Sequence, residues 1–240
     1  MNPLNPSGHA PLVTPVQGFD AFVVDEPWPW AEQHADEIAA HWERARTDKP
    51  ALFDGKVLVA RRMEITGGVW RAAHIVIPYS GLKYWLSLGF VEAGAFNTFA
   101  SGVVVTADGA VLLGRMGGHT ANAGRLYFPC GTPDLDDVSG DVFDVEASMT
   151  RELGEETGLG PAHLAPTDQR WIVQDGPLVC CARRFDSALT AGELEAVVTA
   201  HLAADPQPEL DGVLLVRRVG ELDGQPAQHY ARALVATVLG

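Results

Sequence analysis

The 240-residue sequence predicts an α/β protein in which helices cover a sheet. Short apolar runs rich in β-branched residues alternate along the chain with longer segments of helical periodicity. Glycine-containing turns separate consecutive strand-like runs at two places, which is typical of hairpins. Hydrophobic residues make up 47% of the chain, so it can bury a core of this kind.

The first twenty residues contain prolines and glycines without a period, and we expect an extended or loosely held arm there. The elements expected after it are a helix (31–46), a hairpin (57–63 and 69–77), a short helix (82–88), a second hairpin (101–106 and 110–115), a helix (144–157), two strands (171–173 and 178–184), a helix (191–204), a strand (213–217) and a terminal helix (226–239). The second hairpin begins the main domain. We therefore expect an N-terminal α+β extension over 1–95 and a main domain over 96–240.

The charge balance disfavours two classes of partner. The chain has 17 Lys and Arg against 31 Asp and Glu, a net charge of −14, which argues against nucleic-acid or anionic membrane surfaces. The N-terminus lacks a basic segment before an apolar stretch, and no apolar run reaches 18 residues. Three cysteines are too few for a disulfide framework. We expect a soluble, cytoplasmic protein that acts on a small molecule, and a homodimer is possible.

Three glutamates share one face of the helix expected over 144–157. Glu152, Glu155 and Glu156 stand at positions i, i+3 and i+4, where like charges repel each other. Such a cluster needs a counter-charge, and a divalent cation is the most economical one. Oxygen ligands favour Mg²⁺ or Mn²⁺ over Zn²⁺. The alternative is an ordinary solvated acidic helix face.

Residues 151–159 read Arg-Glu-Leu-Gly-Glu-Glu-Thr-Gly-Leu and resemble the end of the Nudix box. Phe128-Pro129-Cys130-Gly131 resembles the strand end and turn that precede this box, with Cys130 where the family usually has glycine. The resemblance implies a Nudix α/β/α sandwich with a mixed sheet. It also implies magnesium-dependent hydrolysis of a diphosphate joined to another group, typically in a nucleoside diphosphate derivative.

The resemblance also implies roles for single residues. Glu155 and Glu156 would be metal ligands, together with the backbone carbonyl of Cys130. Glu152 would bind a further metal ion or would orient and deprotonate the nucleophilic water. Arg151 would hold a glutamate in place, and a surface pair with Glu155 is the alternative. Family members often use a distant acidic residue as well; Glu209, ahead of an expected strand, is the candidate, and Asp211 competes with it.

The chain departs from the family pattern at one acidic position. The family's earlier glutamate falls on Phe143, and the loop before the helix carries an insertion. Candidates to replace the carboxylate are Asp134, Asp136, Asp137 and Asp141, against the alternative of a solvated acidic loop. The departure also motivates a second hypothesis, a non-catalytic Nudix-fold sensor that binds a nucleotide sugar.

Candidate substrate contacts lie between the strand expected over 110–115 and the box. They are Arg115, His119, Asn122, Arg125 and Tyr127. Arginine can grip phosphate with a bidentate fork, and tyrosine can stack on a base. His119 and Asn122 have the alternative of being ordinary turn or surface residues.

The extension offers a second, looser resemblance, over about residues 35–90. Ala51-Leu52-Phe53-Asp54-Gly55, two strands and Tyr84-x-x-x-Leu88-Gly89 are similar to the extension of Nudix enzymes that split UDP-glucose and UDP-galactose. This similarity places a UDP-sugar, cleaved to UMP and a sugar 1-phosphate, ahead of ADP-ribose, a CoA derivative or a dinucleotide.

Overall fold

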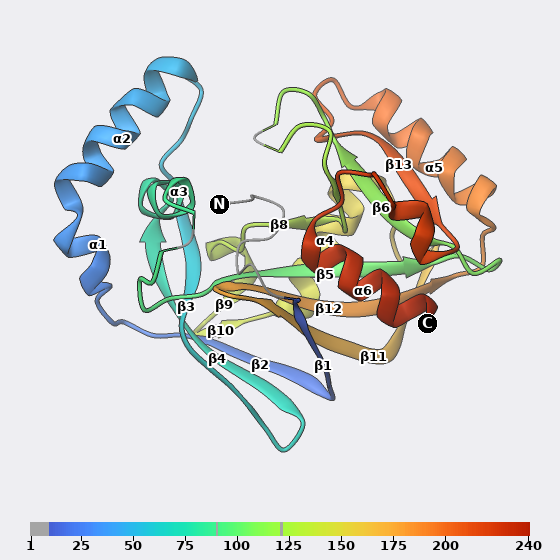
Figure 1. Ribbon diagram of the computed structural model, residues 1–240, viewed down its shortest axis with the longest axis horizontal. Coiled ribbons are helices and arrows are strands. Elements are labelled where there is room, and N and C mark those ends of the chain that lie inside the picture. Colours follow the sequence, from blue (N-terminus) through green and yellow to red (C-terminus); the bar gives the residue numbers. More distant parts are fainter. Residues whose placement is uncertain (1–9, 90, 121) are drawn as a thin grey trace.

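The computed structural model of the protein describes residues 10–89, 91–120 and 122–240 (Figure 1). The predicted α/β class is confirmed, with two β-sheets and helices packed against them. None of the helices in these ranges is long and apolar enough to cross a membrane.

The larger sheet is mixed and is built mostly from the second half of the chain. Its strand order is β1-β11-β12-β5-β6-β13, with two short strands added at β6 and β5. The strands are β1 (Leu12–Val16), β5 (Asn97–Val105), β6 (Val111–Met116), β7 (Leu126–Tyr127), β8 (Cys130–Gly131), β11 (Leu164–Asp175), β12 (Leu178–Ser187) and β13 (Leu210–Val216). β12 runs parallel to β5, and the other described pairs of this sheet are antiparallel.

Helices cover both faces of this sheet. α4 (Val145–Thr157) and α5 (Ala191–Ala204) pack on one face, and α6 (His229–Leu239) packs on the other. Side chains alternate along β5, so Phe99 and Val103 share a core cluster with Tyr230 of α6, whereas Val104 packs with Leu153 of α4. The helix that carries Glu152, Glu155 and Glu156 is thus one of the covering layers.

The smaller sheet has the order β3-β4-β2-β10-β9. Its strands are β2 (Gly18–Val23), β3 (Lys56–Thr66), β4 (Val69–Pro78), β9 (Val138–Ser139) and β10 (Val142–Phe143). β3 and β4 form the predicted hairpin. The helices α1 (Pro29–Gln33), α2 (Ala35–Asp48) and α3 (Tyr79–Ser87) lie beside this sheet, at the left of Figure 1. The helix expected over 31–46 is therefore present, but it is interrupted at His34.

The structure corrects the expectation of a loose arm over the first twenty residues, of which 1–9 lie outside the described residues. Residues 12–16 form β1, which pairs with β11, and residues 18–23 form β2, which pairs with β4. Pro15 is compatible with a strand because β1 lies at the edge of its sheet. β1 therefore joins the larger sheet, while β9 and β10, from the inserted loop, join the smaller one. The division of the chain at residues 95 and 96 stays a prediction.

Candidate active site

Two caps fix the ends of α4. The Asp144 carboxylate accepts a hydrogen bond from the backbone N–H of Ala147 at 2.9 Å, as expected of an N-cap. Gly158 ends the helix in the left-handed conformation, at φ 70°. His201 of α5 closes over this turn, with its Nε2 2.9 Å from the Glu155 carbonyl oxygen. Both ends of the helix that carries the glutamates are therefore fixed in place.

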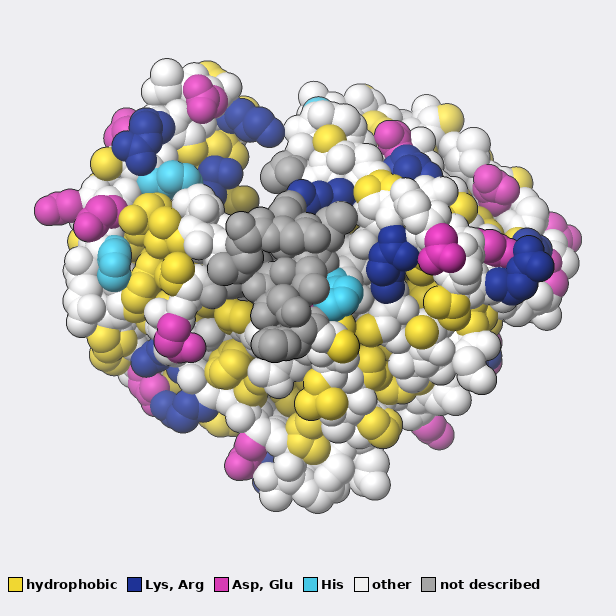
Figure 2. Space-filling model, viewed as in Figure 1, with side chains coloured by type: hydrophobic (Ala, Val, Ile, Leu, Met, Phe, Trp, Pro, Cys, Tyr) yellow, Lys and Arg dark blue, Asp and Glu magenta, His cyan; other side chains and the backbone are white. Residues whose placement is uncertain are grey.

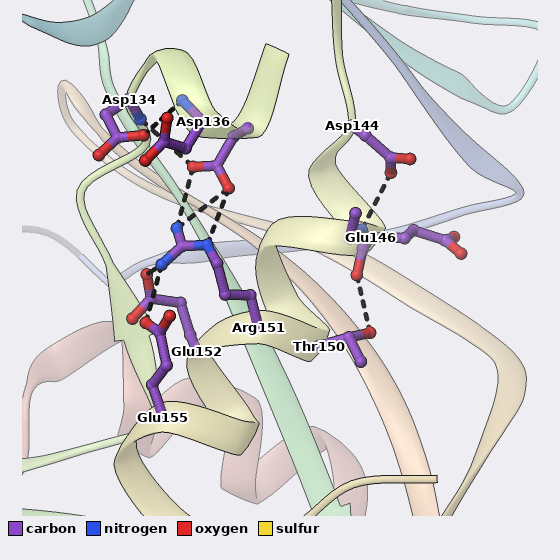
Figure 3. Close-up of polar contacts among 10 residues, drawn as sticks. Asp134, Asp136, Asp144, Glu146, Thr150, Arg151, Glu152 and Glu155 are labelled. Atoms are coloured by element: carbon purple, nitrogen blue, oxygen red, sulfur yellow. Dashed lines mark hydrogen bonds and ion pairs between the residues drawn. The ribbon is translucent and has the colours of Figure 1, made fainter. Parts of the chain in front are cut away.

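Arg151 is the centre of a cluster of carboxylates (Figure 3). One terminal nitrogen lies 2.9 Å from Glu152 Oε1 and 2.9 Å from Glu155 Oε2. The other lies 3.0 Å from Asp137 Oδ1 and 3.1 Å from Oδ2. The Asp137 side chain is only 2% exposed, whereas that of Glu155 is 60% exposed. Arg151 thus links the inserted loop to the helix, and it holds two of the three glutamates.

Glu152 and Glu156 are buried side by side, one turn apart on α4. Burial, opposed by Arg151 and reinforced by Glu155, raises the pKa of Glu152 to about 7. Burial and the neighbouring Glu152 raise the pKa of Glu156 to about 9. Among the described residues, no cationic side chain forms an ion pair with Glu156. Within the described ranges, Glu156 is therefore buried without a cationic partner and keeps its proton at neutral pH when no metal ion is bound.

The strand β8 lies directly against this pair. The backbone N–H of Cys130 donates to Glu156 Oε1 at 3.1 Å. A side chain at Gly131 would collide with the Glu152 carboxylate and displace it, so glycine at this position lets the strand lie against that carboxylate. Burial raises the pKa of the Cys130 thiol well above its usual range, which argues against a nucleophilic role. The predicted metal ligation by the Cys130 carbonyl stays a prediction.

These residues fit a divalent cation that keeps several water ligands. No three His, Cys, Asp or Glu side chains of the described chain converge into a ready-made metal cage. Glu155 is held at the surface by Arg151, whereas Glu152 and Glu156 are buried together. Mg²⁺ is bound by one or two carboxylates plus substrate phosphates rather than by an all-protein cage. Two adjacent carboxylates of which one lacks a counter-charge match that requirement.

Glu209 lies on the same side of the molecule as the pair. It is exposed just before β13, its backbone carbonyl accepts from Gly117 N–H at 2.7 Å, and its charge adds to the raised pKa of Glu152 and of Glu156. Asp211, its competitor, is exposed on β13 itself. A role of either residue in metal binding stays a prediction.

The structure shows where Phe143 and the aspartates of the acidic loop lie. Phe143 is 3% exposed and packs edge-on against the His74 ring. Of the four aspartates proposed as replacements, Asp137 alone contacts Arg151. Asp134 instead caps the short 3₁₀ helix over Leu135–Asp137 and accepts from Asp136 N–H. Asp137 is therefore the carboxylate that the loop brings to the site.

A cavity of about 650 Å³ opens beside Glu156 and β8. Three predicted substrate contacts line it: Asn122, Arg125 and Tyr127. Arg115 and His119 do not line it. Arg115 is held on β6 opposite Leu126, and the His119 carbonyl accepts from Lys49 Nζ at 3.3 Å.

Other residues that line the cavity were not among the predicted substrate contacts, although Leu88 and Gly89 belong to the motif quoted for the extension. The C-terminal end of α3 and the two residues after it contribute residues 86–89, and Gln228, just before α6, and Tyr230, in its first turn, also line the cavity. In Figure 2 the surface is hollowed between the lobe that carries α2 and the lobe that carries the β6–β7 loop, with Lys and Arg side chains on both sides. No local pattern brings Gln228 and Tyr230 together with residues 86–89, because these segments lie far apart in the sequence.

No model of a protein family matches the sequence, and no curated protein matches it. Solved structures with a similar arrangement include RenU, a Nudix hydrolase from M. smegmatis (TM-score 0.39, 15% identity, 60% of this chain and 88% of that chain). Another is the MutT protein from Methanosarcina mazei Go1 (TM-score 0.39, 19% identity, 60% of this chain and 92% of that chain). A third is an Ap4A hydrolase from C. elegans (TM-score 0.40, 14% identity, 59% of this chain and 92% of that chain). Similarity at this level assigns neither an activity nor a substrate.

Proposed function

We propose that the chain is a Nudix hydrolase that requires a divalent metal ion and cleaves the diphosphate of a nucleoside diphosphate derivative. One observation carries this proposal. The complete motif over residues 151–159 lies on α4 with Glu152 and Glu156 buried side by side, and Glu156 lines a cavity large enough for such a substrate. The solvated acidic face is disfavoured, because these two carboxylates are buried.

Glu156 would hold the metal ion, with Glu155 and Glu209 as further carboxylates at the rim, and the free oxygen of Glu152 would be left for the nucleophilic water. When bound, Mg²⁺ or Mn²⁺ would neutralise phosphate oxygens and lower the pKa of a bound water. The ion would also supply the counter-charge that Glu156 otherwise lacks. This donor set contains oxygen ligands alone, as hard divalent cations prefer.

Glu152 is suited to receive a proton from the attacking water. Arg151 contacts its Oε1, so Oε2 is the oxygen that remains for the water. Its pKa of about 7 is close to neutral pH, where a general base is most effective. Asp137 fixes the guanidinium with two contacts and so supports the orientation of Glu152.

A UDP-sugar is the substrate we favour within this class, with cleavage between the phosphates to give UMP and a sugar 1-phosphate. Support comes from the loose similarity of residues 35–90 and from the position of α3, whose end forms a wall of the cavity. Arg125 lines the same cavity and can pair with a phosphate. ADP-ribose, a CoA derivative and a dinucleotide are the competing substrates.

The test is product formation with Mg²⁺ from UDP-glucose, UDP-galactose, ADP-ribose, ADP-glucose, NADH, CoA and a dinucleoside polyphosphate. Glu156→Gln should abolish turnover, whereas Glu195→Gln, which removes an exposed charge on α5, should not change it. UMP from UDP-sugars alone would support the full proposal. Cleavage of another substrate would keep the hydrolase and discard the UDP-sugar. Binding without turnover would favour the nucleotide-sugar sensor.

A further inference from the structure

Gln228 and Tyr127 form a polar pair in the wall of the cavity. Gln228 Nε2 donates to Tyr127 Oη at 2.6 Å, and both residues line the cavity. Gln228 is 6% exposed and precedes α6, where its backbone N–H donates to the Leu126 carbonyl at 3.2 Å. Its main chain is therefore fixed beside the strand that carries Tyr127, and its amide has little freedom to turn away.

The direction of this hydrogen bond decides where the phenolic hydrogen points. A side-chain amide nitrogen is a donor without an accepting lone pair, so Tyr127 Oη is the acceptor in this contact. Arg125, whose guanidinium also interacts with the phenol, is likewise a donor only. No acceptor for the Tyr127 hydroxyl hydrogen is found among the described residues. Within the described part of the chain the hydrogen is thus left without an acceptor, and a ligand in the cavity could accept it.

The phenol keeps this hydrogen at neutral pH. Burial raises the pKa of Tyr127, and the contacts from Gln228 and Arg125 oppose this rise only in part. The ring also lies 6.4 Å from the Tyr230 ring, tilted by 56°, so protein covers that side of it. Stacking on a base, the role expected from the sequence, is less suited to this setting than donation.

We propose that Tyr127 donates its hydroxyl hydrogen to a phosphate oxygen of the bound substrate, and that Gln228 is a positioning residue that directs this hydrogen into the cavity. The inference rests on the proposed function, because it requires a phosphate-bearing ligand in this cavity. Arg125 lines the cavity beside the phenol and supplies the positive charge that favours phosphate over a neutral oxygen. Tyr127 and Arg125 would then hold the same group.

The test measures KM and kcat with whichever substrate of the panel the wild type cleaves fastest. Tyr127→Phe removes the hydroxyl alone, and it should raise KM by about tenfold or more, since a lost hydrogen bond to a charged group has this effect, with kcat within about twofold. Gln228→Glu replaces the donor by an acceptor that captures the hydrogen, so its KM should rise equally. Gln228→Met, which cannot donate and accepts only weakly, should raise KM less.

The double variant of Tyr127→Phe and Gln228→Glu separates the proposal from simple charge repulsion. Its KM should equal that of Tyr127→Phe, because no hydroxyl remains to be redirected. If the KM increases of the two single variants multiply in the double variant, the role of Gln228 is overturned. An unchanged KM in Tyr127→Phe would overturn the role of Tyr127. If Gln228→Glu fails to fold, Tyr127→Phe carries the test of donation. A wild type that binds members of the panel without cleaving them would overturn the proposed hydrolase, and the same variants would then be compared by Kd; a wild type that binds none of them would overturn this inference as well.

Discussion

Replacing Glu156 by Gln should stabilise the metal-free protein at alkaline pH while it removes activity. The pKa of this carboxyl is about 9 in the fold, against an ordinary value of 4.5. Between these values the unfolded chain has lost the proton and the folded chain retains it. The free energy of unfolding therefore falls as pH rises from 4.5 towards 9.

The size of this loss in the free energy of unfolding follows from the pH range between the ordinary pKa of the carboxyl and its pKa in the fold. Each pH unit inside it costs the fold about 1.4 kcal/mol per group, so the loss between pH 4.5 and 7.5 reaches at most about 4 kcal/mol for Glu156. Glu152 adds to the slope only up to its pKa of about 7. A glutamine at position 156 cannot ionise, yet its amide oxygen can still accept from Cys130 N–H.

Urea unfolding in EDTA from pH 5 to pH 8.5 is the assay. The variant should show a flatter decline than the wild type and a higher free energy of unfolding at pH 8. Added Mg²⁺ should stabilise the wild type more at pH 8 than at pH 5, because the ion binds ionised carboxylates, and it should stabilise the variant less. An equally steep decline in the variant, or a variant less stable than the wild type at pH 8, would refute the reasoning.

Two further predictions concern the supports of the site. Asp137→Asn should lower kcat by about tenfold or more with KM little changed, because it removes the buried charge that fixes Arg151; steady-state kinetics measure this, and an unchanged kcat would exclude Asp137 as the replacement for the family's glutamate. Gly158→Ala should lower the free energy of unfolding by about 1–3 kcal/mol, because alanine is strained at φ 70° and would collide with the His201 ring; a loss below about 0.5 kcal/mol in urea unfolding would show that this turn relaxes freely.

Local patterns predicted most of the regular elements. α5 matches its expected bounds, and α4 begins and ends at the caps read from Asp144 and Gly158. β1 and β2 were missed because their partners, β11 and β4, lie far along the chain and the local sequence contains Pro15. Strand pairing over such separations leaves no periodic signal in a single segment.

In the candidate site too, the sequence predicted what depends on neighbouring positions and missed what depends on contacts between distant segments. The spacing of Glu152, Glu155 and Glu156 was visible in the sequence because a helix places nearby positions on one face. The choice of Asp137 among four aspartates depends on how the inserted loop packs against Arg151. Gln228 was missed because nothing near it indicates that α6 begins at the cavity.

The N-terminal strand β1 belongs to the larger sheet, which is built mostly from the second half of the chain, and this constrains the order of folding during synthesis. Leu12 at the start of β1 pairs with Gln174 in β11, so this edge of the larger sheet cannot close until most of the chain has left the ribosome. Until then β1 is an unpaired strand edge, which can template wrong pairing. Truncation just before β11 should therefore yield a chain prone to aggregation, and the two sheets of the full chain should unfold in one transition.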